Sequence, residues 1–132
     1  MKLKNFQSKH AIIKSWNNTI VSRAIIVFPK NITELKKLVQ NLKKMKKNYS
    51  IRTGLCSYDS KSLNPNFETI IISLRNINKI SKINLKEKYI DVETGALISD
   101  VIKKIKKKNI TLFSVPGGNK ISIGGAISAN TI

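Results

Sequence analysis

Two glycine pairs near the C-terminus are the residues whose type and spacing most clearly suggest chemistry. Pro116-Gly117-Gly118 is followed, after a short spacer, by Ile123-Gly124-Gly125 and the small residues of 126–130. Glycine loses much conformational entropy on folding, so such clusters usually serve turns with positive φ or a close approach of backbone to a ligand. The second pair also opens a segment that predicts the start of a helix, where free N–H groups attract anions. The pattern indicates a phosphate or cofactor loop.

A loop of the same kind follows a predicted strand earlier in the chain, and it is the first of the two loops in chain order. It is Arg52-Thr53-Gly54-Leu55-Cys56-Ser57-Tyr58-Asp59. A glycine beside hydroxyl side chains can turn several backbone N–H groups toward a phosphate. The competing interpretation is a plain turn at the end of a strand, with serine and aspartate as turn formers. The segment matches neither GxGxxG nor GxxxxGK[ST], which argues against a Rossmann domain and a P-loop NTPase.

Signals for catalysis and for metal binding are weak. His10 lies in a polar segment without an evident partner, so we expect a surface residue. Asp91 and Glu93 alternate along a predicted strand, which a solvated sheet face explains. Cys56 would be a nucleophile only beside a histidine. One cysteine and one histidine do not make a Cys/His zinc site, and we predict no metal. Trp16 fits either the core or the cover of a cofactor edge.

The net charge of +18 raises the possibility of a polyanion partner. The lysines, however, fall at 36–47 and 103–108 on predicted amphipathic helices, with only three arginines in the chain and no interleaved aromatic residues. Lysine, isoleucine and asparagine make up about two-fifths of the sequence, as in a protein from an AT-rich genome. We therefore interpret the basic helices as solvated faces, and keep a small module that binds nucleic acid or another polyanion as the alternative function.

Length and hydropathy predict one soluble, cytoplasmic domain. The 132 residues suffice for a single core. No apolar run approaches the roughly 20 residues of a membrane span, and the N-terminus lacks the apolar region of a signal peptide. The single cysteine excludes an internal disulfide.

The pattern along the chain predicts an α+β (α/β-like) fold, a small sheet with flanking helices. The strongest strand is the β-branched run Thr69–Leu74, expected to be buried on both faces. Asn31 and Glu34 form a capping-box pattern before an amphipathic helix. Residues 1–10 are expected to fray, and a helix is expected to begin where the chain ends, as if the chain were cut. Other expected strands are 24–28, 49–53, 79–84, 89–94 and 110–113, and a second helix runs from Leu97 to Ile105, closed by Asn109.

Taken in order, these motifs resemble the PCMH-type FAD-binding domain of the vanillyl-alcohol oxidase / p-cresol methylhydroxylase flavoproteins, closest to the aldonolactone oxidase / decaprenylphosphoryl-ribose oxidase branch. The resemblance covers about Ser15 to Ile132, and its most specific part is the closing pair of glycine motifs. The other segments that carry it are Ser15-Trp16, Phe28-Pro29 with the capped helix, the loop 52–58 with Asn64, and Asp91–Ala96.

The resemblance implies that the first loop holds the FAD pyrophosphate and the second passes along the flavin. Family members usually carry more glycine in the first loop, and those with covalent FAD have a histidine where this chain has Cys56. Non-covalent FAD is therefore implied. The cofactor-binding residues expected on this pattern are Thr53, Gly54, Leu55, Cys56, Ser57, Tyr58, Asn64, Pro116, Gly117, Gly118, Ile121, Ser122, Gly124 and Gly125.

The implied parent is a flavin-dependent oxidoreductase that oxidises an alcohol or a sugar- or lactone-type substrate by hydride transfer to the flavin. Residues 1–14 are expected to be a polar extension and 15–132 the N-terminal part of the FAD-binding domain. The second FAD-binding subdomain and the substrate domain are expected to be missing, together with the catalytic residues and the contacts to a small-molecule substrate. The fragment alone is expected to be inactive.

Overall fold

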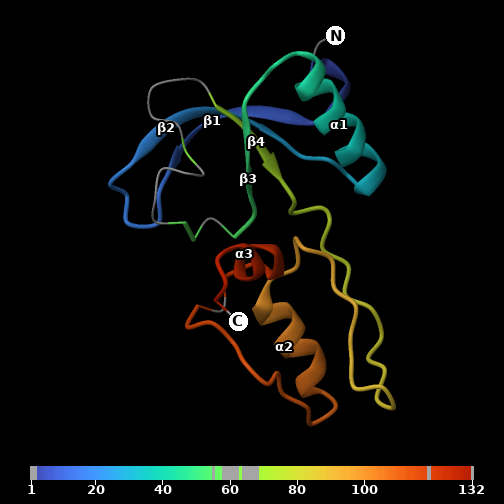
Figure 1. The fold of residues 1–132 in the computed structure, drawn as a ribbon. Coiled ribbons are helices and arrows are strands. Elements are labelled where there is room, and N and C mark those ends of the chain that lie inside the picture. Colours follow the sequence, from blue (N-terminus) through green and yellow to red (C-terminus); the bar gives the residue numbers. More distant parts are fainter. Residues whose placement is uncertain (1–2, 55, 58–62, 64–68, 119, 132) are drawn as a thin grey trace.

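The computed structural model describes residues 3–54, 56–57, 63, 69–118 and 120–131. It has mixed α and β content, which confirms the predicted α+β class (Figure 1). Predicted residues Leu55, Tyr58 and Asn64 lie outside the described residues. The elements in chain order are a 3-10 turn η1 (Leu3–Asn5), β1 (Ser8–Lys14), β2 (Val21–Val27), α1 (Ile32–Lys44), β3 (Tyr49–Arg52), β4 (Thr69–Ser73), α2 (Ile98–Lys106) and α3 (Ile123–Ser128).

The four strands form one mixed sheet in the order β1-β2-β4-β3. β1 runs antiparallel to β2, with Ser8 opposite Val27 and Lys14 opposite Val21, and β4 is parallel to both β2 and β3. The prediction that residues 1–10 fray is therefore wrong from Ser8 onward. An edge strand tolerates polar side chains because it faces solvent, and the exposed His10 lies on this strand. Strand β1 thus extends the sheet into the segment expected to be an extension.

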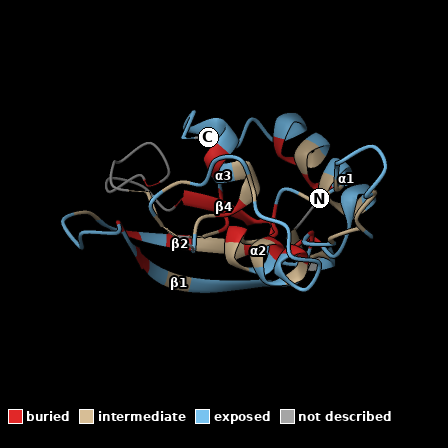
Figure 2. Ribbon diagram, turned by 90° about the horizontal axis from the view of Figure 1, so that it is seen from below, coloured by how far each residue is buried: buried red, intermediate tan, exposed pale blue. Residues whose placement is uncertain are grey.

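Strand β4 lies in the middle of the core, and all five of its residues are buried (Figure 2). Ile70 and Ile72 belong to the core on the side of α1, whereas Ile71 belongs to a smaller core on the opposite face. This alternation follows from the period of two in a strand. It confirms the prediction of a strand buried on both faces. The first core also holds Val27, Leu38, Leu42, Leu74 and Ile77, and the second Ile13, Ala24 and Leu63.

Helix α1 begins with the cap that the sequence predicts. The Glu34 N–H donates to Asn31 Oδ1 at 2.9 Å, and the Glu34 carboxylate accepts from the N–H of Lys30, one residue before the cap. Leu38 and Leu42, four residues apart, are fully buried. Capping and the apolar stripe therefore act together to hold α1 on the sheet.

The second half of the chain is less regular than the sequence predicts. The segments 79–84 and 89–94 form a hairpin with only isolated bridges, Ile80 to Val92 and Asn84 to Tyr89, instead of two full strands. The predicted strand 110–113 is wrong: this segment is a loop in which Phe113 is fully exposed. This segment belongs to no described sheet, so its backbone makes no strand pairing among the described residues.

Helix α2 is present as expected, with Val101 and Ile105 buried and Asn109 in the left-handed region (φ 55°) just beyond its end. None of the described helices is both long and apolar enough to cross a membrane.

Gly95 joins the sheet to the helical half. Its N–H donates to Ile77 O at 2.9 Å. A Cβ atom at this position would lie 1.9 Å from Leu74 O and 2.4 Å from Ile77 O, both main-chain atoms. Its φ is not positive, so glycine is needed here for space and not for handedness. Close packing at Gly95 fixes the path from the end of β4 to the start of α2.

We predict that Gly95→Ala lowers the free energy of unfolding by about 3 kcal/mol, because the new methyl group must push two main-chain carbonyls apart. Urea denaturation followed by circular dichroism measures this value. Gly117→Ala is the matched control, since nothing lies within 4 Å of a Cβ there. Equal stability of the two variants would contradict the packing role of Gly95.

Candidate cofactor-binding site

The two glycine-bearing loops that the sequence predicts for one site lie against each other, between the end of β3 and α3 (Figure 1). A Cβ on Gly54 would lie 2.6 Å from Lys120 O, 3.1 Å from Ser122 N and 3.4 Å from Ile121 Cα. Main chain therefore packs directly on main chain. The loop after β3 and the segment before α3 form one continuous surface, which a larger residue at 54 would open.

The first loop is also tied to the turn between β1 and β2. The Trp16 N–H donates to Ser57 O at 2.9 Å, and the Cys56 thiol donates to Gly54 O at 3.2 Å. Thr53 is buried, whereas Cys56 and Ser57 are half-buried. Trp16 is 50% exposed, so it is not an ordinary core residue. These hydrogen bonds hold the described part of the loop against the turn that carries Trp16.

Helix α3 begins where the second glycine pair predicts it, but its first donors are occupied. Buried Ser122 caps the helix by accepting from Gly125 N–H at 3.2 Å. The N–H groups of Ile123 and Gly124 each donate at 2.9 Å to carbonyl oxygens of the segment 94–96. The prediction that this helix start offers free N–H groups to an anion is therefore wrong. Packing of α3 on residues 94–96 consumes those donors.

The glycines of the second loop, residues 116–125, differ in how closely other atoms pack where a Cβ atom would lie. A Cβ on Gly124 would lie 3.0 Å from Thr94 Cβ, so packing explains that residue. Gly118 would contact only the Ile121 side chain, at 3.2 Å, and Gly117 would contact nothing within 4 Å. Gly117 is exposed, and no described glycine has a positive φ. Neither packing nor handedness therefore accounts for Gly117.

Three loop glycines keep free backbone donors. Within the described residues, the N–H groups of Gly54, Gly117 and Gly118 donate to no protein acceptor. Pro116 and Gly118 are half-buried beside the exposed Gly117, and Ile121 N–H closes the turn on Gly118 O at 3.4 Å. Free N–H groups on backbone without Cβ atoms are what a negatively charged ligand requires at close range.

Arg52 is a functional candidate that the sequence pattern did not indicate. Its side chain is only 5% exposed, and Nη2 donates to Lys14 O at 3.1 Å. Nε and Nη1 are buried and have no hydrogen-bond partner among the described residues. Burial lowers the pKa of Arg52, and its interaction with Cys56 acts in the opposite direction. A buried cation with two unpaired donors, one residue before the first loop, suits an anionic ligand.

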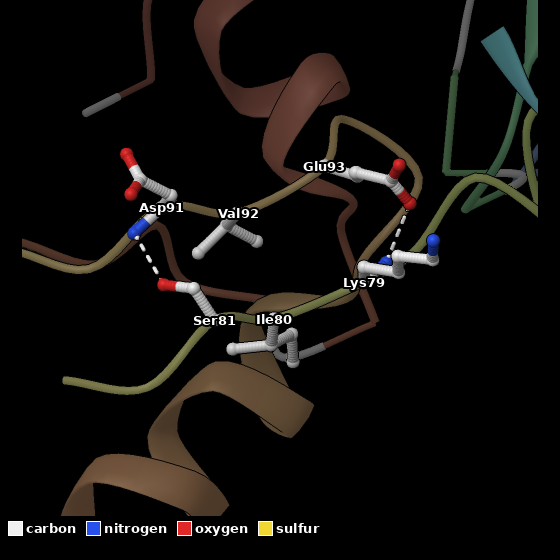
Figure 3. Close-up of a pocket in the computed structure, with 6 residues that line it drawn as sticks. All are labelled: Lys79, Ile80, Ser81, Asp91, Val92 and Glu93. Atoms are coloured by element: carbon white, nitrogen blue, oxygen red, sulfur yellow. Dashed lines mark hydrogen bonds between the residues drawn. The ribbon is translucent and has the colours of Figure 1, made fainter.

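A separate hollow lies in the hairpin, and Figure 3 shows its lining. Glu93 Oε2 accepts from Lys79 N–H at 2.7 Å, and Asp91 N–H donates to Ser81 Oγ at 2.9 Å. Asp91 is exposed as the sequence predicts, while Glu93 is half-buried. These bonds hold the hairpin together. The described residues contain no group of three or more metal-ligating side chains. The lining residues are Lys79, Ile80, Ser81, Asp91, Val92 and Glu93.

Comparison with protein families gives one match, to the FAD binding domain, over residues 23–132. The match includes both glycine loops and the segment 94–96 that supports α3. No curated protein matches the chain.

Several solved structures share the fold. Cholesterol oxidase from B. sterolicum superposes with a TM-score of 0.87 at 16% identity, covering 97% of this chain and 25% of its own. An alkyldihydroxyacetonephosphate synthase gives a TM-score of 0.72 at 20% identity, covering 90% and 24%. A berberine bridge enzyme variant in complex with (S)-reticuline gives 0.69 at 26% identity, covering 89% and 22%. The chain thus spans about a quarter of the length of these proteins.

We predict that Arg52→Met leaves the free energy of unfolding within about 1 kcal/mol of the parent protein, or raises it, because an apolar side chain of similar length removes an unpaired buried charge. Denaturant unfolding without added ligand measures this. Arg52→Ala is the companion variant, and its cavity should cost about 2 kcal/mol. A loss above about 2 kcal/mol in Arg52→Met would show that the guanidinium is structural.

Proposed function

Since the chain belongs to the FAD binding domain family, we propose that residues 15–132 form the first FAD-binding subdomain of a flavin-dependent oxidoreductase of the vanillyl-alcohol oxidase / p-cresol methylhydroxylase type. The proposed substrate is an alcohol or a sugar- or lactone-type compound, as in the aldonolactone oxidase / decaprenylphosphoryl-ribose oxidase branch. The second FAD-binding subdomain and the substrate domain would come from polypeptide outside residues 1–132.

The observation that carries the proposal is the close approach of Gly54 to the backbone of 120–122, where a Cβ atom on residue 54 would lie 2.6 Å from Lys120 O. It supports one cofactor wall built from two loops that are distant in sequence. The free N–H groups of Gly54, Gly117 and Gly118 suit a diphosphate, which needs several oriented donors. The buried guanidinium of Arg52 adds positive charge directly before the first loop. The residues present therefore fit FAD.

The proposed contacts to FAD are assigned to segments in chain order. Residues 53–58 would hold the pyrophosphate, with the hydroxyl of Ser57 adding to the backbone donors. Residues 116–118 and 121–125 would border the rest of the cofactor. Gly124 and Ser122 would contribute indirectly, because they hold α3 in place. Asn64 belongs to the same proposed set, on the strength of the sequence pattern alone. Trp16 would cover one edge of the bound group.

We propose that FAD is held non-covalently. Cys56 stands where covalent members of the family have a histidine, and its thiol donates to Gly54 O at 3.2 Å. Bound FAD would accept a hydride from the substrate. The described residues of this chain would bind the cofactor, orient it and cover one side of it. A cytoplasmic location is part of the proposal, because one free cysteine suits a reducing compartment.

We predict that Gly117→Val raises the Kd for FAD at least about tenfold and leaves the fold intact, because its side chain enters open space in the protein but blocks the approach of a ligand. Quenching of FAD fluorescence on titration with the complete gene product measures the Kd, and thermal melting without FAD checks the fold.

Ser114→Val is the matched control, since it places the same side chain on an exposed residue of the same loop. It should bind FAD as the parent does. A parent protein that is colourless and takes up no FAD would reject the proposed function. Normal FAD binding by Gly117→Val would remove Gly117 from the cofactor wall.

We also predict that Arg52→Met lowers FAD affinity about tenfold or more, whereas Arg52→Lys keeps part of it, because the charge survives in the second variant only. Isothermal titration at two salt concentrations measures both affinities. The loss in Arg52→Met should shrink at high salt, since screening already weakens the parent's attraction for the diphosphate. Equal loss in both variants at all salt concentrations would point to packing instead of charge.

A further inference from the structure

The tip of the hairpin 79–93 and the end of α2 project from the same side of the molecule, away from the sheet and α1 (Figure 1). Lys104 Nζ donates to Ile80 O at 2.6 Å and fastens the hairpin along the helix. The turn at the hairpin tip is ordered by the pairing of Asn84 with Tyr89 and by Glu87 N–H donating to Asn84 Oδ1 at 3.0 Å. Side chains on these two segments are therefore presented together from a fixed frame.

This surface, which we name the basic end, carries a strong excess of positive charge. Seven exposed lysines lie on it, against the carboxylates of Glu87, Asp91 and Asp100. It contains no arginine. The lysines are Lys82, Lys86 and Lys88 at the hairpin tip and Lys103, Lys106, Lys107 and Lys108 on and just after α2.

Large apolar side chains are exposed among these lysines. At the hairpin tip Leu85 is 58% exposed and Tyr89 is 52% exposed, with Lys86 and Lys88 between them. Phe113, in the loop that follows α2, is fully exposed. Single exposed apolar residues are common on protein surfaces, but Leu85 and Tyr89 lie together at one ordered turn between lysines. The exposed apolar residues of the hairpin tip and the lysines beside them therefore call for one common explanation.

We propose that the basic end is a peripheral docking surface for membranes that contain anionic lipids. Lysines attract an anionic leaflet, and their long stems let the charge stay at headgroup level while nearby apolar side chains enter the acyl boundary. Leu85 and Tyr89 supply that apolar insertion from a short, ordered turn. The lysines favour a partner with negative charge, and the exposed apolar residues favour a lipid membrane among such partners.

Nucleic acid is the less suitable partner for the same surface. Specific contacts to bases rely on arginine forks, and single strands need aromatic rings on which bases stack. Tyr89 is the one aromatic residue at the hairpin tip, and an exposed Leu85 gains nothing from a phosphate backbone. The proposal does not depend on FAD, because none of these residues belongs to the proposed cofactor wall.

Co-sedimentation of the complete, FAD-loaded gene product with vesicles tests the proposal. Vesicles of phosphatidylcholine with about 30% phosphatidylserine should bind the protein, and pure phosphatidylcholine should not. Lys86→Glu/Lys88→Glu should lower the partition coefficient about tenfold or more. Leu85→Ser should lower it about threefold at unchanged charge. Lys36→Glu/Lys37→Glu, the same charge change on exposed residues of α1, is the matched control and should stay within about twofold of the parent.

Several results would overturn the proposal. They are absence of binding to the anionic vesicles, equal losses in the α1 and hairpin double variants, and full binding by Leu85→Ser. A duplex DNA titration is run in parallel. DNA binding that Lys86→Glu/Lys88→Glu abolishes and Leu85→Ser leaves unchanged, without vesicle binding, would assign the basic end to nucleic acid.

Discussion

The arrangement of this molecule depends on main chain approaching main chain where a side chain is absent. Gly95 brings the segment before α2 onto the end of β4, Gly124 seats α3 on that same segment, and Gly54 closes the loop after β3 on residues 120–122. None of the described glycines has a positive φ, so the requirement is for space. These contacts form a series from the sheet to α3. The two cofactor loops meet because each contact in the series is made.

Elements whose cause is local could be predicted from the sequence. The Asn31 cap and the leucine stripe fix α1 without reference to the rest of the chain, and the run of isoleucines in β4 is compatible only with burial on both faces. Strand β1 could not be predicted, because its polar residues are acceptable only on an edge that pairs with β2. The segment 110–113 has the composition of a strand but no neighbour to pair with. Pairing is a tertiary property that composition does not contain.

The candidate site shows the same limit. The order of the glycine motifs in the sequence predicted that two distant loops form one site. In the structure, the close approach of Gly54 to residues 120–122 brings the described parts of these loops together. The motif could not separate Gly124, which packing on Thr94 explains, from Gly117, for which the described residues show no packing requirement. The burial of Arg52 could likewise not be predicted, since only the folded chain shows that its guanidinium is buried with one acceptor, Lys14 O, among the described residues.

The use of donors in the site favours a cofactor wall that is formed before the ligand arrives. The first N–H groups of α3 are satisfied by Ser122 and by the segment 94–96, so the helix keeps its place whether or not an anion is bound. Among the described residues, the N–H groups of Gly54, Gly117 and Gly118 and the Nε and Nη1 atoms of Arg52 have no protein acceptor. Two buried guanidinium donors without a partner among the described residues raise the free energy of the ligand-free state, and under the proposed function a diphosphate that paired with them would stabilise the folded chain by linkage. Under the proposed function, cofactor binding and folding stability would be coupled through Arg52, while glycine packing and the hydrogen bond from Trp16 N–H to Ser57 O position the described parts of the loops.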